Sequence, residues 1–256
     1  MLKVFCAPAR YLQGKNATAE LGPQMNRLGL GGPALIIAGT SAIRLLTPTW
    51  DETFRQAGVA FNVRKFGGEC SEAEIDAGIA EARATGTRVI VGAGGGKCLD
   101  AARAVAAALE LPVVNCPTLA ASDAPCSALS VIYSEAGDFK EYLFYRRNPD
   151  LVLVDTAVIA SAPARYLVSG LGDALATWFE ARTVIEAYQP NQLGGATTLA
   201  GGALARLCYD TLIADSADAL AAVERQVVTP ALERIVEANT LLSGLGFESG
   251  GLAIAH

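Results

Sequence analysis

The sequence predicts an α/β N-terminal part with a mostly parallel sheet, followed by an all-helical C-terminal part. Two observations lead to this fold class. Short apolar runs alternate with longer stretches of helical periodicity up to about residue 155, and only helical patterns follow after it. Such alternation is typical of a parallel sheet covered by helices on both faces. We therefore expect two domains, over residues 1–160 and 161–256.

The N-terminal part contains seven candidate strands, each a short apolar run bounded by turn residues. They are Lys3–Cys6, Ala34–Ala38, Ala60–Phe66, Arg88–Val91, Pro112–Cys116, Ala128–Tyr133 and Leu151–Val154. The segment Glu141–Phe144 lies near Gly137-Asp138 and is expected to pair with Ala128–Tyr133 as an antiparallel hairpin.

Helical spacing is found between the strands and throughout the C-terminal part. The predicted helices are Ala17–Leu28, Ser41–Ala57, Glu72–Ala84, Lys97–Leu109, Tyr166–Tyr188, Gln192–Ala214, Ala217–Val227 and Pro230–Leu242. Gly29, Gly58 and Gly86 follow three of them directly, as expected where a helix ends in a left-handed residue.

Composition excludes several classes of protein. A net charge of −6 gives no clustered basic surface for nucleic acid, and no uninterrupted apolar run is long enough to cross a membrane. The six cysteines include no C-x-x-C pair, and the N-terminus has no secretory leader. Scattered, reduced cysteines without a leader favour a cytoplasmic location.

The most informative segment runs from Arg88 to Asp100, where a strand leads into three glycines that open a helix. Without Cβ atoms, Gly94, Gly95 and Gly96 let backbone N–H groups approach a phosphate, and the helix N-terminus adds positive charge. The segment is neither a Walker A loop nor a first-strand G-x-G-x-x-G fingerprint. A tight strand-to-helix turn that binds nothing is the alternative.

Two further segments carry groups suited to a ligand. Thr118, Ser122, Asp123 and Ser127 lie on a loop that leaves the carboxyl end of a candidate strand, where α/β sheets place ligands. An Asx or Ser turn before Pro125 explains the same residues without a ligand.

Asp173 lies on an Ala-rich predicted helix and, if it points inward, needs a partner such as a cation. A capping or surface aspartate is the other interpretation. His256, the single histidine of the chain, is open to the same two interpretations.

Taken together, these segments resemble the iron-containing (group III) alcohol dehydrogenase superfamily, and within it the glycerol dehydrogenases. The resemblance spans the whole chain in order. It rests on Tyr11-x-Gln-Gly14, Gly94-Gly-Gly-Lys97 with Asp100, Thr118, Ser122-Asp-Ala-Pro125, Ser127-Ala-Leu-Ser-Val-Ile-Tyr133, Ala162-Pro-x-Arg165, Gly170-Leu-Gly-Asp-Ala-Leu-Ala-Thr177, Phe179-Glu-Ala181 and Phe247-Glu-Ser-Gly-Gly-Leu252.

The resemblance implies an NAD-dependent and zinc-dependent oxidation of glycerol to dihydroxyacetone by a homo-oligomer. Asp123 would be the catalytic residue that contacts the substrate, and Asp173 and His256 would bind zinc beside it. The residues implied to bind NAD are Gly94, Gly95, Gly96, Lys97, Cys98, Thr118, Leu119, Ser127, Leu129 and Tyr133.

Two departures from the family pattern matter. Gly39 occupies a position where relatives commonly have an aspartate for the adenosine ribose, so we expect a weakened preference for NAD over NADP. The chain also ends at His256, before a further histidine that the resemblance implies as a zinc ligand. On this basis we expect a C-terminally truncated enzyme with weak zinc binding and low glycerol oxidation. A dehydrogenase for another small polyol and a non-catalytic nucleotide-binding fragment are the alternatives.

Overall fold

The computed structural model describes residues 1–253 and divides the chain into two compact units. One, called here the α/β unit, comprises Pro8–Thr118 and Ala128–Asp155. The other, the helical unit, comprises Met1–Ala7, Leu119–Ser127 and the chain from Thr156 onward. Each unit is thus assembled from segments that are not continuous in sequence.

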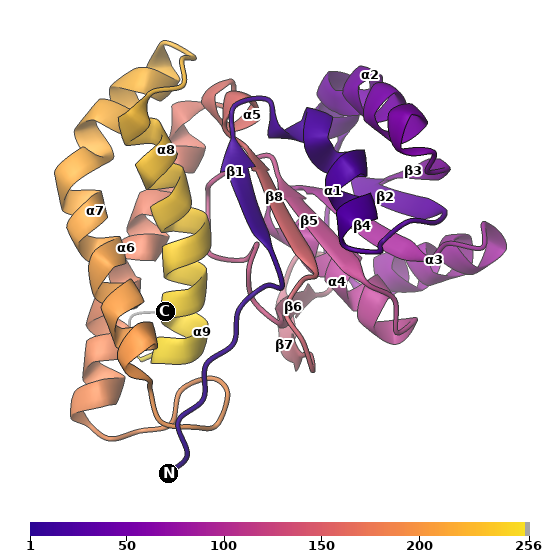
Figure 1. The fold of residues 1–256 in the computed structure, drawn as a ribbon. Helices are drawn as coiled ribbons and strands as arrows, with labels where there is room; N and C mark the ends of the chain where they lie inside the picture. Colours follow the sequence, from indigo (N-terminus) through magenta and orange to yellow (C-terminus); the bar gives the residue numbers. More distant parts are fainter. Residues whose placement is uncertain (254–256) are drawn as a thin grey trace. The chain divides into compact units, whose positions relative to one another are not determined.

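The α/β unit is built on a parallel sheet of six strands in the order β1-β8-β5-β4-β2-β3 (Figure 1). The prediction of a mostly parallel sheet is confirmed. Its strands are β1 (Tyr11–Gly14), β2 (Ala34–Ala38), β3 (Phe61–Lys65), β4 (Val89–Gly94), β5 (Val113–Pro117) and β8 (Leu151–Asp155). The four central strands are buried along their whole length, as expected for strands covered on both faces.

Four α-helices and one short 3₁₀ helix, η1, connect these strands in the described part of the α/β unit. They are η1 (Ala17–Glu20), α1 (Leu21–Arg27), α2 (Thr40–Ala57), α3 (Glu72–Ala84) and α4 (Gly96–Ala108). Residues of α3 and α4, among them Ala82 and Val105, pack on Leu35, Ile37 and Ile90 of the sheet in one apolar cluster. The expected glycine ends of three helices are confirmed, with positive φ angles at Gly29, Gly58 and Gly86.

A separate antiparallel hairpin follows the fifth strand of the sheet. It consists of β6 (Leu129–Tyr133) and β7 (Phe139–Phe144), with Leu129 opposite Phe144. The predicted hairpin is therefore confirmed. Ile132 of β6 packs against Ala101 of α4, which attaches the hairpin to the α/β unit.

One predicted strand is wrong and one strand was not predicted. Lys3–Cys6 forms no strand, and Lys3 makes only an isolated bridge with Ala196 inside the helical unit. The edge strand β1 (Tyr11–Gly14) pairs instead with β8. The apolar run Lys3–Cys6 has high β-propensity, but pairing with a partner strand decides which segment becomes a strand.

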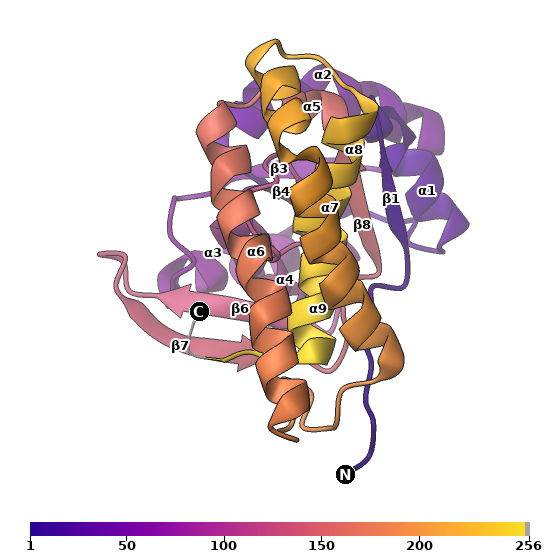
Figure 2. The ribbon, with the colours of Figure 1, turned by 90° about the vertical axis from the view of Figure 1, so that its left-hand side faces the viewer.

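The helical unit contains α5 (Thr156–Ala160), α6 (Ala164–Glu186), α7 (Leu199–Glu224), α8 (Pro230–Glu237), η2 (Ala238–Leu242) and α9 (Ser243–Gly250). The prediction of an all-helical C-terminal part is confirmed for the described residues. The helices α6, α7, α8 and α9 pack alongside one another (Figure 2). Two predicted helices, Gln192–Ala214 and Ala217–Val227, are replaced by the continuous helix α7. The segment η2 is a turn of π-helix within the run from α8 to α9.

Small residues let these helices approach closely. A Cβ atom at Gly246 of α9 would lie 2.7 Å from Cγ2 of Thr177 and 3.2 Å from Cα of Ala205. A Cβ atom at Gly250 would lie 2.9 Å from Cβ of Ala181. The glycines and alanines of α6, α7 and α9 therefore set the separation of the helices.

The order of the strands reverses between β2 and β4, because β3 lies on one side of β2 and β4 on the other. In open parallel sheets, ligands bind beyond the carboxyl ends of the strands at such a reversal. The residues that follow β2 and β4, Gly39 and Gly95, lie at this place.

Candidate functional site

The glycine loop joins β4 to α4. A Cβ atom at Gly94 would lie 2.8 Å from Cβ of Cys98, so the first turn of α4 can pack on the strand only because residue 94 is glycine. Gly95 is the N-cap of α4, and no side chain caps the first turn. The uncapped end presents backbone N–H groups and positive partial charge, which is the arrangement that binds phosphate.

The ends of three strands meet at this loop. The N–H of Gly39, after β2, donates to the carbonyl of Ala93 (3.1 Å), and the N–H of Thr118, after β5, donates to the carbonyl of Gly94 (3.0 Å). A Cβ atom at Gly39 would meet nothing within 4 Å. The loop is thus held by backbone bonds on both sides, and there is space for a side chain at residue 39.

Lys97 and Tyr133, two predicted cofactor residues, lie together. The Nζ of Lys97 is 4.4 Å from the centre of the Tyr133 ring and within 2.6 and 2.8 Å of the two carboxylate oxygens of Glu69. Sequence reasoning missed Glu69, because it is 28 positions from Lys97 and no local pattern links them. Both partners of the ion pair are partly exposed, so solvent screens it.

Asp100, which belongs to the predicted loop segment, is buried and has a structural partner. Its carboxylate pairs with Arg103 and accepts the N–H of Val131 (3.2 Å), and its carbonyl accepts the hydroxyl of Ser130 (2.8 Å). Burial raises the pKa of Asp100, and Arg103 opposes this shift. Asp100 therefore attaches α4 to β6.

Cys98 was predicted near the cofactor, and its side chain faces the interior. The thiol donates to the carbonyls of Ile37 (3.4 Å) and Ala93 (3.6 Å). Burial raises the pKa of Cys98 to about 12, as it does for Cys70 and Cys116. These thiols are protonated at neutral pH and offer no nucleophile.

The predicted substrate and metal residues Asp123 and Asp173 are brought together within the helical unit. The backbone N–H of Asp123 donates to Oδ2 of Asp173 at 2.9 Å. Cys208 of α7 was not predicted to lie here. Burial raises its pKa to about 12, and the carboxylates of Asp123 and Asp173 add to that shift. Two aspartates 50 positions apart in sequence are thus in direct contact.

Close packing holds the loop that carries Asp123. A Cβ atom at Gly170 of α6 would overlap the carbonyl oxygen of Ala120 and lie 2.5 Å from Nδ2 of Asn239. That Nδ2 donates to the same carbonyl at 3.0 Å. A Cβ atom at Gly244 would lie 3.0 Å from the carbonyl oxygen of Asp123. Asn239 belongs to the π-helical turn, a feature that is frequent at functional sites.

The remaining predicted residues fall in both units. Thr118 and Leu129 belong to the α/β unit, and Leu119 and Ser127 to the helical unit. The hydroxyl of Ser127 donates to the carbonyl of Ala124 at 3.5 Å, inside the loop of Asp123.

The predicted zinc ligands are Asp173 and His256. His256 lies outside the described residues. Among residues 1–253, no three side chains of histidine, cysteine, aspartate or glutamate are grouped in a way that would hold a metal ion. A zinc site needs three protein ligands. The described donors, centred on Asp173, therefore do not complete one.

Over the described part of the chain, none of the helices combines the length and the apolar character that a bilayer span requires.

Comparisons with known proteins agree with this arrangement. The family described as iron-containing alcohol dehydrogenase matches residues 8–156. The glycerol dehydrogenase of Thermotoga maritima is 52% identical over 258 aligned residues, which cover 100% of this chain and 69% of that protein. The glycolaldehyde reductase of Halobacterium salinarum is 48% identical, with 100% of this chain and 70% of that protein covered.

A solved structure shows the same fold. The crystal structure of a probable glycerol dehydrogenase from Sinorhizobium meliloti superimposes with a TM-score of 0.90 and 43% identity, over 99% of this chain and 69% of that one. The fold, the glycine loop and the matches along the chain lead to one conclusion: this chain belongs to the iron-containing alcohol dehydrogenase family of oxidoreductases, and its close relatives in that family include glycerol dehydrogenases.

Proposed function

We propose that this chain catalyses the NAD-dependent oxidation of glycerol to dihydroxyacetone. The observation that carries the proposal is the glycine loop between β4 and α4, with its uncapped helix end and its backbone bonds to the ends of β2 and β5. Relatives that are about half identical to this chain carry the name glycerol dehydrogenase.

The dinucleotide is proposed to bind with its pyrophosphate at the N-terminus of α4. Gly94–Gly96 would supply backbone donors, Lys97 a positive charge, and Cys98 the packing of the first turn. The other proposed contacts are Thr118, Leu119, Ser127, Leu129 and Tyr133. The Lys97 ammonium already lies over the Tyr133 ring, which supports a shared role for these two residues.

Asp123 is proposed to contact the hydroxyl groups of glycerol, and Asp173 and His256 to bind zinc. The hydrogen bond from Asp123 to Asp173 supports a joint site. A bound zinc ion would lower the pKa of the alcohol and so favour its oxidation. The described donors do not complete a zinc site. We therefore assign to these residues only the binding and orientation of the polyol. Self-association into a homo-oligomer is proposed from family membership.

A second substrate has specific support. The relative from Halobacterium salinarum, 48% identical over the whole chain, is named a glycolaldehyde reductase. Reduction of glycolaldehyde by NADH and a proton gives ethylene glycol, which is hydride transfer of the same kind run in the opposite direction, on a different pair of compounds. We therefore propose glycolaldehyde as the alternative substrate of the same site.

The test compares both reactions in one assay. Purified protein with added zinc is given glycerol and NAD⁺, or glycolaldehyde and NADH, and the change in NADH is followed. The proposal predicts slow turnover with at least one pair, because the described donors do not complete a zinc site, and a higher kcat/KM for glycerol than for glycolaldehyde. NAD binding without turnover of either substrate would support the non-catalytic alternative instead.

A variant tests the cofactor assignment. The Gly95→Trp substitution places a bulky side chain at the N-cap of α4 and should abolish NAD binding in calorimetry while the unfolding transition is retained. An unchanged affinity would show that the loop does not bind the pyrophosphate.

A further inference from the structure

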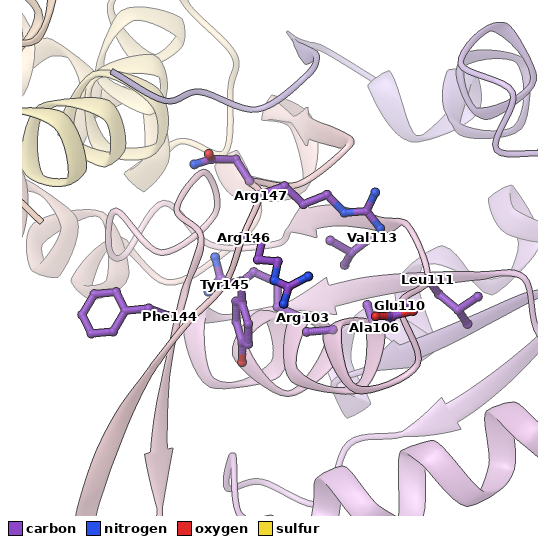
Figure 3. Close-up of a pocket in the computed structure, with 11 residues that line it drawn as sticks. Arg103, Ala106, Glu110, Leu111, Val113, Phe144, Tyr145, Arg146 and Arg147 are labelled. Atoms are coloured by element: carbon purple, nitrogen blue, oxygen red, sulfur yellow. The ribbon is translucent and has the colours of Figure 1, made fainter. Parts of the chain in front are cut away.

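A cavity of about 650 Å³ lies within the α/β unit, at the C-terminal end of α4 (Figure 3). It is lined by the last turns of α4, by Val113 at the start of β5 and by the segment 144–148 between β7 and β8. The glycine loop is at the other end of α4, so this cavity is separate from the proposed cofactor site. Its volume is in the range of small-molecule sites.

The residues that line the cavity carry a net positive charge, although the whole chain has a net charge of −6. Three arginines line the cavity, Arg103, Arg146 and Arg147, against one carboxylate, Glu110. Arg103 is 3% exposed and is held by its buried pair with Asp100, whereas Arg146 and Arg147 are exposed. Neither of these two forms an ion pair with any residue in the described part of the chain.

Guanidinium groups without an internal carboxylate partner are suited to an external oxyanion. Their planar donors bind a carboxylate or a phosphate through two parallel hydrogen bonds. Burial of Arg103 and of Asn148, which is 8% exposed, gives the cavity a fixed polar wall beside the two exposed arginines.

Apart from the Tyr145 hydroxyl, the rest of the lining is apolar. Ala106, Leu111, Val113 and Phe144 contribute aliphatic and aromatic surface, and the Phe144 side chain is 60% exposed. An inorganic anion would leave this surface in contact with water, whereas an anion with an attached apolar group would cover it.

We infer that this cavity binds a small amphipathic anion, a carboxylate or phosphate ester that carries a short apolar or aromatic group. Arg146 and Arg147 bind the oxyanion, and the apolar group contacts Leu111 and Val113. This site is additional to the proposed dehydrogenase site and does not depend on it.

The test measures binding of phenyl phosphate to the whole protein by calorimetry, with benzoate as the carboxylate probe and benzyl alcohol as the neutral comparison. The proposal predicts saturable binding at one site for at least one of the two anions, and none for benzyl alcohol. Equal binding of inorganic phosphate and phenyl phosphate would overturn the amphipathic assignment, as would the absence of binding of both aromatic anions.

Variants locate the site. Replacing both Arg146 and Arg147 by alanine should weaken binding at least about tenfold, since charge-assisted hydrogen bonds of this kind contribute that much or more. The matched control replaces Arg44 and Arg83 by alanine. These arginines are also exposed and form no ion pair within the described residues, and their replacement should leave the affinity unchanged. The Glu110→Gln substitution removes the single carboxylate of the lining and should tighten binding.

The glycine loop is a competing anion site, and a further variant separates the two. Phenyl phosphate should bind equally well to the Lys97→Ala protein and in the presence of saturating NAD⁺. If binding is lost in Lys97→Ala but kept when Arg146 and Arg147 are replaced, the anion occupies the glycine loop and the proposal is wrong. Failure of the dehydrogenase assay would leave this result unaffected.

Discussion

Gly39 is a residue at which a single side chain should change cofactor selection. It lies directly after β2, its backbone is in an ordinary extended conformation, and a Cβ atom there would meet nothing within 4 Å. Its N–H is bonded to Ala93 on the strand that leads into the glycine loop. A side chain at residue 39 would thus extend from a fixed backbone beside the proposed dinucleotide.

We predict that Gly39→Asp raises the preference for NAD over NADP. The new carboxylate would accept a hydrogen bond from the ribose 2′-hydroxyl and repel a 2′-phosphate. The preference, measured as the ratio of the two kcat/KM values, should rise by about tenfold or more, the effect of one charged hydrogen bond. Gly39→Asn is the matched control without charge and should change the ratio less. An unchanged ratio in the aspartate variant would show that other groups select the cofactor.

Two glycines of α6 differ sharply in their surroundings. A Cβ atom at Gly170 would overlap the carbonyl oxygen of Ala120, whereas at Gly172 it would meet nothing within 4 Å. We predict that Gly170→Ala lowers the free energy of unfolding by roughly 1–3 kcal/mol, as overpacking does. Gly172→Ala should raise it by up to about 1 kcal/mol through helix propensity. Urea unfolding measures both. Equal effects would show that the loop 119–127 can shift away from α6 without cost.

Some residues of the candidate site can be predicted from the sequence and others cannot. The glycine loop was recognised because its pattern is local. Glu69, Asn239 and Cys208 were missed because their roles depend on partners far away in sequence, such as Ala120 for Asn239, 119 positions apart. A polar residue in a helical pattern does not reveal which carbonyl it will bond.

At the scale of elements, α4 is attached to β6 by the buried pair of Asp100 and Arg103. Burial raises the pKa of Asp100, so its ionised form costs stability unless Arg103 is present. A carboxyl group whose pKa is higher in the folded than in the unfolded state favours folding at low pH, and this contribution is lost as pH rises through the folded pKa. The Arg103 guanidinium therefore contributes most to the stability of the fold at neutral pH, where Asp100 has to be ionised.

We predict that Arg103→Met lowers the free energy of unfolding by about 3–5 kcal/mol at neutral pH, the usual cost of breaking a buried pair. The loss should shrink as pH falls towards the ordinary range of aspartate, because Asp100 can then be protonated. The double variant Asp100→Asn with Arg103→Met should recover much of the loss and show no such pH dependence. Denaturant titrations at several pH values measure this dependence. A loss of unfolding free energy that is the same at every pH would contradict the role of Asp100.

Element boundaries show what periodicity can and cannot predict. Glu72–Ala84 was predicted with its observed bounds, since Ser71 caps it and Gly86 follows it. The chain from Gln192 to Val227 was predicted as two helices, Gln192–Ala214 and Ala217–Val227, whereas α7 runs without a break from Leu199 to Glu224. Arg234 pairs with Asp215 from α8 and stabilises that turn of the helix, a contact that no local pattern contains.

The buried cysteines of the molecule make it possible to follow the opening of each unit separately. Cys70, Cys98 and Cys116 are buried in the α/β unit, and Cys126 and Cys208 in the helical unit. We predict that saturating NAD⁺ slows alkylation of the first group by on the order of a hundredfold at a hundred times its Kd, since a ligand stabilises the unit that binds it. Labelling of Cys208 in particular should slow less, because most of the proposed NAD contacts belong to the α/β unit. Mass spectrometry of the labelled peptides measures this, and equal protection of both groups would show that the units open together.

The discontinuous make-up of the units has a consequence for biosynthesis. The chain passes from one unit to the other at residues 7 and 8, 118 and 119, 127 and 128, and 155 and 156. During synthesis, all segments of the α/β unit are present once Asp155 has emerged from the ribosome. The segment Met1–Ala7 can form the bridge between Lys3 and Ala196 only after Ala196 has emerged. The N-terminal segment, though synthesised first, is thus among the last to reach its native position. A gene cut at residue 156 would separate the third segment of the helical unit from the other two.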